Sequence, residues 1–205
     1  MKRVILGFLL IFSFSKSIAK SDSIVNPQVR YSPTMICNLL TSNNKYIKIT
    51  YGQPFKKGRV IFGELIPYGE VWRTGANEAT EINFSCPFKI GDRRFESGTY
   101  TLFTLPRADS WDIILNARLG QWGAFTYDPG QNLHQFPAKP VINTNIYEGF
   151  TIEMFETKKD EIEIKLLWDN VSVPFRVELL KENESHTPKA GLIKKKKFLG
   201  IFTRK

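Results

Sequence analysis

The feature that most constrains the fold is the regular alternation of apolar and polar residues toward the C-terminus. Residues 150–154, 161–168 and 171–179 each alternate, and a polar turn at 157–160 separates the first two runs. A period of two places the apolar side chains on one face, which is typical of an antiparallel sheet packed on one side. Pro174 lacks an N–H group, so its strand is expected at a sheet edge or near a bulge.

Shorter runs of the same kind precede this region. Residues 46–51, 80–84, 98–105 and 111–115 are rich in β-branched and aromatic residues, and Gly-containing turns recur between them. No helical period extends beyond two turns. These runs predict an all-β fold over residues 45–180, an antiparallel β-sandwich or a jelly-roll-like arrangement.

The N-terminus has the pattern of a secretory signal. Lys2 and Arg3 precede an apolar stretch over 4–14, and Ser17 and Ala19 are small residues at a cleavage site. We expect residues 1–19 to be removed after Ala19, which places the mature protein in the periplasm or outside the cell. An uncleaved anchor is the alternative. Residues 20–44 are mixed and polar, and are interpreted as a lead-in segment.

The mature chain keeps two cysteines. Cys37 and Cys86 would allow one disulfide in an oxidising compartment, and two separate thiols are the alternative. The chain contains no Cys-x-x-Cys, no His-Glu-x-x-His and no Gly-x-Ser-x-Gly motif. The sequence therefore predicts no metal site, no cofactor and no catalytic residue.

The positive charge lies at the two ends of the chain. The whole sequence carries +9, whereas residues 20–180 are neutral overall. A nucleic-acid-binding domain would concentrate Lys and Arg on a structured face, so no nucleic-acid partner is expected. The basic tail 181–205 is interpreted as a disordered end. Its block Lys194–Lys197 would alternatively make weak contact with an anionic membrane.

The segment 71–80 holds the densest polar chemistry. Arg73, Asn77, Glu78 and Thr80 surround a Gly turn. Alternation predicts that Arg73 and Glu78 meet, either as a buried ion pair or as part of a site for a small ligand. In the second case Asn77 and Thr80 join the site, and stacking walls would come from three aromatic residues, Tyr51, Trp72 and Trp122.

Two further expectations concern neighbours of this segment. Trp122 stands between Gly120 and Gly123, where it either caps the core or lines a pocket. Glu78 and Glu81 would fall on opposite faces of one strand, so the two carboxylates would not flank one bond.

Several of these stretches resemble a bacterial family catalogued as domain of unknown function 2911. The similar stretches are 50–54, 57–63, 67–80, 97–104 and 116–123. The resemblance implies an exported bacterial all-β protein, and it implies no reaction.

The sequence thus favours an exported binding or interaction module for an unknown small molecule or envelope component. One alternative is a hydrolase-like enzyme that acts on envelope sugar or peptide material through Glu78. The other is a structural envelope protein whose basic tail contacts lipid.

Overall fold

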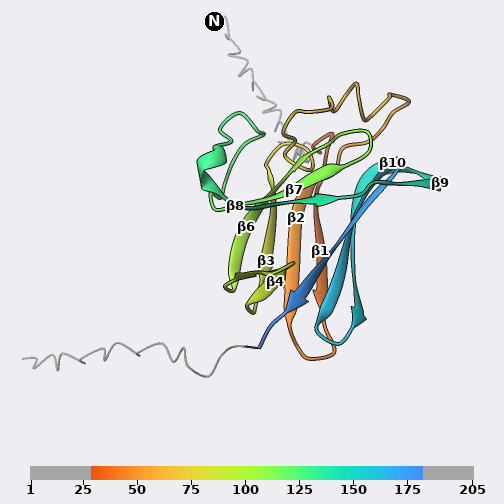
Figure 1. Cartoon of the computed structure of the whole chain (residues 1–205). Helices are drawn as coiled ribbons and strands as arrows, with labels where there is room; N and C mark the ends of the chain where they lie inside the picture. Colours follow the sequence, from red (N-terminus) through yellow and green to blue (C-terminus); the bar gives the residue numbers. More distant parts are fainter. Residues whose placement is uncertain (1–28, 182–205) are drawn as a thin grey trace, which may run out of the picture.

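The structure is a computed structural model that describes residues 29–181. Its strands form two antiparallel sheets (Figure 1). The first sheet has six strands in the spatial order β1 (Thr34–Leu40), β2 (Tyr46–Gly52), β3 (Thr80–Phe84), β6 (Gly98–Leu105), β7 (Trp111–Asn116) and β8 (Asn132–Ala138). The second has four, in the order β5 (Arg93–Phe95), β4 (Phe88–Ile90), β10 (Glu161–Leu179) and β9 (Val141–Lys158). A 3-10 turn, η1 (Pro129–Gln131), precedes β8. The expected all-β antiparallel sandwich is confirmed.

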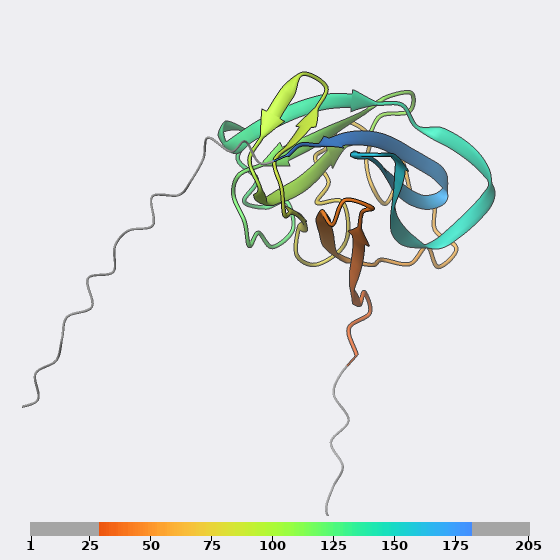
Figure 2. The same ribbon diagram turned by 90° about the horizontal axis from the view of Figure 1, so that it is seen from below.

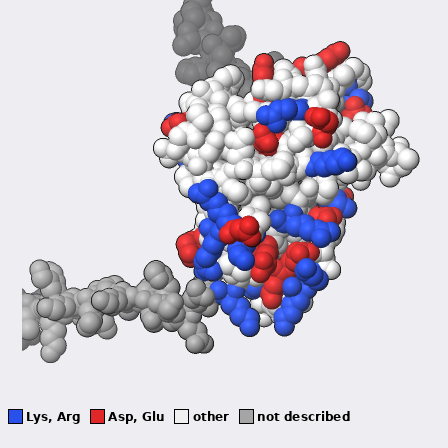
Figure 3. Space-filling view, viewed as in Figure 1, with Lys and Arg blue, Asp and Glu red and all other residues white. Residues whose placement is uncertain are grey.

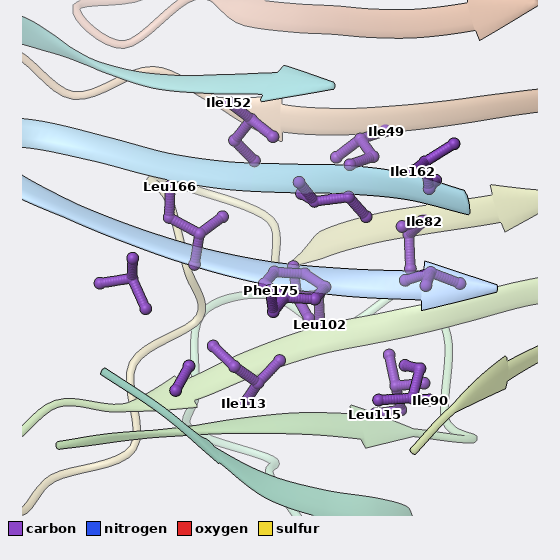
Figure 4. Close-up of a cluster of buried hydrophobic side chains, with 14 of the residues drawn as sticks. Ile49, Ile82, Ile90, Leu102, Ile113, Leu115, Ile152, Ile162, Leu166 and Phe175 are labelled. Carbon is purple, nitrogen blue, oxygen red and sulfur yellow. The ribbon is translucent and has the colours of Figure 1, made fainter. Parts of the chain in front are cut away.

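The core lies between the two sheets. Figure 4 shows aliphatic side chains from both sheets meeting there, for example Ile49, Ile82 and Leu102 opposite Ile152 and Leu166. All five are at most 3% exposed. Their register follows from alternation, since Ile49 pairs with Ile82 across β2 and β3. Hydrophobic burial of this two-layer core is the main stabilising term of the fold.

The chain passes between the two sheets three times, from β3 to β4, from β5 to β6 and from β8 to β9. After β8 the chain passes through 139–140 into β9, and it thereby moves from the first sheet to the second (Figure 2). β10 is one continuous strand with register shifts on both sides of Asp169, whose φ is 53°. In the sequence, residues 169–170 separate the alternating runs 161–168 and 171–179. In the structure this separation is a bulge inside one strand. Pro174 lies between the stretch of β10 that pairs with β9 and the stretch that pairs with β4. Its missing N–H group therefore interrupts neither ladder.

The expectation for residues 20–44 is wrong. Residues 20–44 are not only a lead-in, because Thr34–Leu40 forms β1 and pairs with β2 along its whole length. The sheet therefore begins before residue 45. β1 has apolar residues on both faces and is mostly exposed, so its sequence lacks the alternation that marks the other strands. Of the two alternatives for Cys37 and Cys86, the described part of the chain has the one without a disulfide between them. Cys37 is on β1, where burial raises the pKa of its thiol.

The expectations for the two chain ends stay predictions. The proposed signal 1–19 and the basic block Lys194–Lys197 lie outside the described residues. Within residues 29–181 no helix is long and apolar enough to cross a membrane. On the face shown in Figure 3, basic and acidic side chains lie intermixed toward the end that carries the β9–β10 turn. Ion pairs such as Arg176 with Glu163 contribute to that surface.

Candidate functional site

The segment 71–79 is a compact turn rather than the end of a hairpin. Trp72 exchanges two backbone hydrogen bonds with Thr104 of β6, at 2.7 and 2.9 Å. Thr74 and Asn77 then take left-handed conformations, with φ of 56° and 63°. Each left-handed residue redirects the chain, so the alternation of a strand does not continue through this segment. The side chains of 73–78 consequently point to different places.

A close backbone approach fixes this turn against β2. The N–H of Ala76 donates to the carbonyl of Gly52 at 3.0 Å. A Cβ atom on Gly52 would lie 2.0 Å from the carbonyl oxygen of Ala76. Only glycine permits that contact, which explains why a glycine ends β2 here.

Trp72 belongs to the core and does not form a stacking wall. It is 4% exposed, and its indole N–H donates to the carbonyl of Gly75 at 3.0 Å. Its ring stacks on Trp168 with the centroids 5.8 Å apart. Thr80 is likewise structural: it is fully buried, and its hydroxyl donates to the carbonyl of Thr74 at 2.6 Å. Neither side chain is available to a ligand.

Arg73 and Glu78 are not a pair, and the central expectation about this cluster is wrong. Glu78 instead accepts hydrogen bonds, at 3.0 and 3.2 Å, from the guanidinium of Arg30. Arg30 lies in the segment that precedes β1. Arg73 and Glu78 line two different cavities. The reason is local, because the left-handed residues Thr74 and Asn77 lie between them and the regular strand begins only at Thr80.

Arg73 lines a cavity of about 390 Å³, here named the Arg73 cavity. Its lining combines cations, apolar side chains and four residues of the 71–79 turn. Its lining consists of Tyr31, Ser32, Pro54, Phe55, Lys57, Arg59, Leu65, Ile66, Arg73, Gly75, Ala76, Asn77 and Trp168. Three of these residues are cations and none is a carboxylate.

The charge of Arg73 lacks compensation from the described residues. Its Nε is buried without a hydrogen-bond partner, and no ion pair forms with any carboxylate in residues 29–181. Burial lowers the pKa of the guanidinium. A partly desolvated cation without a counterion is unfavourable, and an anion that reaches the guanidinium would offset this cost.

The other two cations are held at the rim. Arg59 donates from Nε to the carbonyl of Lys56 at 3.0 Å and from Nη2 to the carbonyl of Phe55 at 2.5 Å. Lys57 lies over the ring of Tyr31, with Nζ 5.4 Å from the centroid. Both cations are exposed, so their role toward a ligand is long-range attraction rather than burial.

Residues 29–33 form one wall of the Arg73 cavity, and this segment is named the N-terminal strap. The amide of Asn77 donates to the carbonyl of Ser32 at 3.0 Å, and the N–H of Gln53 donates to the carbonyl of Pro33 at 2.9 Å. The Arg30–Glu78 pair fixes the strap from the other side. Asn77 therefore holds a wall of the cavity, in addition to lining it.

A second cavity, of about 350 Å³, lies beside the first and is named the Glu81 cavity. It is lined by Thr34, Thr50, Tyr51, Gly52, Glu78, Ala79, Glu81, Gly120 and Gln121. Glu78 and Glu81 both line this cavity, and Glu78 precedes the regular part of β3. Hydrogen bonds from its own N–H and from Arg30 lower the pKa of the Glu78 carboxyl.

Two predicted aromatic residues belong to this second region. Tyr51 is 4% exposed, and its hydroxyl accepts a hydrogen bond from the N–H of Ile152 at 3.3 Å, so it links the two sheets. Burial raises the pKa of the Tyr51 hydroxyl. Trp122 does not cap the core, since it is 56% exposed and forms an isolated bridge with Glu78.

Sequence reasoning missed several lining residues. Tyr31 and Ser32 lie in a segment without a strand pattern, and Lys57 and Arg59 read as an ordinary basic turn. No local signal identifies them, because they reach the cavity only through contacts across the fold. Within residues 29–181 no group of three metal-ligating side chains is placed to hold a metal ion.

Fold and site together define a two-sheet β domain with a cationic cavity at the 71–79 turn. The family model described as Protein of unknown function (DUF2911) matches residues 32–177, and the chain belongs to this family. The resemblance seen in the sequence is thereby confirmed. Searches of the curated proteins and of the solved structures each returned no match.

Proposed function

We propose that this protein is an exported binding module whose ligand is a small organic anion held in the Arg73 cavity. The observation that carries the proposal is a partly buried guanidinium with no counterion in the described chain. A cavity lined by three cations and no carboxylate favours negative charge. Export is supported by the pattern of residues 1–19.

The lining also indicates what is attached to the anionic group. Phe55, Ile66 and Trp168 present apolar surface next to the cations. A cavity of about 390 Å³ is near the lower end of the range for small-molecule sites. The ligand class is therefore a carboxylate, phosphate or sulfate joined to one compact apolar body. Arg73 would supply the buried contact, and Lys57 and Arg59 would attract the anion from solvent.

Benzoate is a suitable probe, with benzamide as its uncharged counterpart of the same shape. Titration calorimetry should detect benzoate and not benzamide, and the affinity for benzoate should fall as salt concentration rises. Arg73→Met should abolish the binding, whereas Arg94→Gln, on β5 and outside the cavity, should retain it. Equal binding of both probes, or unchanged binding by Arg73→Met, would refute the proposal.

Hydrolysis through Glu78 has less support. A glycosidase-type mechanism needs one carboxylic acid with a raised pKa beside an ionised partner. The pKa of Glu78 is lowered, and Arg30 already occupies its carboxylate. Glu81 shares the cavity but accepts a hydrogen bond from the N–H of Gly120 at 2.8 Å, which gives it a structural role.

A further inference from the structure

A polar trough runs over the outer face of the six-stranded sheet. Ile49 and Ile82 face the core, so Thr50 and Glu81 face away from it, and they are direct cross-strand neighbours. Both line the Glu81 cavity and also an adjoining cavity of about 200 Å³. The two cavities therefore form one surface feature, named the outer trough, which continues over Lys48, Asn83 and Thr99.

An exposed tryptophan stands beside one end of the outer trough. Trp122 and Glu78 form an antiparallel bridge, and directly opposed residues project to the same face with Cβ atoms about 4.5–5.5 Å apart. Glu78 lines the trough, so Trp122 is bridged to a lining residue although it is not itself one of them. The flanking Gly120 and Gly123 have φ of 66° and 68°, which lets the chain present the ring between two tight turns.

The trough offers hydrogen-bonding groups of both kinds. Gln121 lines it and is 4% exposed, and its Oε1 has no hydrogen-bond partner although its Nε2 donates to the carbonyl of Arg118. Asn83 and Thr99 both line the trough, and the amide of Asn83 donates to the hydroxyl of Thr99 at 2.9 Å. Carboxylate, amide and hydroxyl oxygens are the groups that pair with ligand hydroxyls.

The charges along the trough balance. Glu81 is matched by Lys48, which lines the same adjoining cavity, and Glu78 is matched by Arg30. A charged ligand would meet no net opposite charge, in contrast to the Arg73 cavity. A neutral ligand with many hydroxyl groups and an apolar ring face fits these features, since the ring face stacks on an aromatic side chain and the hydroxyls pair with polar groups.

We propose that the outer trough is a second binding site, which takes a neutral oligosaccharide with one sugar ring stacked on Trp122. The extended shape, the balanced charge and the single exposed tryptophan carry this assignment. It does not depend on the anion site, because the two cavities have no lining residue in common.

The test uses the full mature chain with cellohexaose, chitohexaose and maltohexaose as separate probes. All four tryptophans lie in the described chain, and Trp72, Trp111 and Trp168 are at most 4% exposed. Binding of at least one probe should therefore shift the tryptophan emission to shorter wavelength and protect Trp122 from quenching by acrylamide. Titration calorimetry supplies the affinity independently of this reporter.

Trp122→Ala should weaken oligosaccharide binding at least tenfold and leave thermal unfolding unchanged. Glu81→Gln should weaken the binding measurably. Phe125→Ala is the matched control, since Phe125 is an 86% exposed aromatic on the same loop and lines neither cavity. The affinity of Phe125→Ala for the oligosaccharide should stay within twofold of the native value. The same result is expected for Arg73→Met. Absence of binding by all three probes at millimolar concentration, or an equal loss in Phe125→Ala, would overturn the proposal.

Discussion

Replacing Arg73 by Met is expected to stabilise the unliganded protein. Met keeps most of the apolar stem and removes a partly buried cation whose Nε has no hydrogen-bond partner. A buried polar group left unsatisfied costs about 1–3 kcal/mol. Part of that gain is offset by lost contacts of the guanidinium, so the free energy of unfolding should rise by about 1 kcal/mol.

The same substitution should reverse the order of stability when ligand is present. Benzoate at one hundred times its dissociation constant would stabilise the native protein by about 2.7 kcal/mol and Arg73→Met not at all. Without ligand the variant is the more stable protein, and with ligand the native protein is. This reversal is the expected result for a cation retained for binding rather than for folding.

Urea unfolding at neutral pH measures both quantities, with an unchanged dependence on denaturant as the check on the native state. In thermal unfolding, 1 kcal/mol corresponds to about 2–4 °C for a domain of this size. Arg94→Gln is the control and should change stability by less than about 0.5 kcal/mol. If Arg73→Met instead loses about 3–5 kcal/mol, Arg73 is part of a buried ion pair and the reasoning is refuted.

Three further substitutions test the framework of the site by urea unfolding. Thr80→Val should lower the free energy of unfolding by about 1–3 kcal/mol, because it removes a buried hydroxyl that donates to a turn carbonyl. Gly52→Ala should cost about 3 kcal/mol, because the added Cβ would lie 2.0 Å from the carbonyl oxygen of Ala76. Glu78→Gln should cost less than about 1 kcal/mol at pH 7, since the pair with Arg30 is exposed. The folded-state pKa of Glu78 is lowered, so this difference is present above the unfolded value near 4.5 and should vanish as pH falls through the folded value.

Each of these results has a clear opposite. Native-like stability of Thr80→Val would mean that the hydroxyl is dispensable, and native-like stability of Gly52→Ala would mean that the backbones are not in close contact. A Glu78→Gln difference that stays constant down to pH 3 would show that the carboxylate is not stabilised in the folded state.

The fold was largely predictable because its determinants are local. Alternation over 150–154 and 161–168 marks strands, and the same alternation selects the face that is buried. Two errors share one cause. β1 is an edge strand with little burial, and the bulge at Asp169 keeps one strand continuous across an apparent turn. In both places long-range pairing decided the structure, and a local pattern cannot report it.

The candidate site was less predictable, as Arg73 and Glu78 show. Alternation assigned both to one face, but two left-handed residues intervene and send them to different cavities. Trp72 and Trp122 are the same residue type, yet one lies in the core and the other is exposed. The composition of the sequence near a glycine turn indicates that polar groups gather there. It does not indicate which of these groups contact one another.

The sequence by itself determined that the chain is an all-β sandwich and which side chains of its alternating strands face the core, because strand periodicity and hydrophobic burial act residue by residue along the chain. Only the tertiary structure decided that Arg73 has no carboxylate partner within residues 29–181, that the N-terminal strap walls its cavity, and that Trp122 stands beside the outer trough. Those features depend on contacts between segments far apart in sequence, and on two backbone conformations that alternation does not encode.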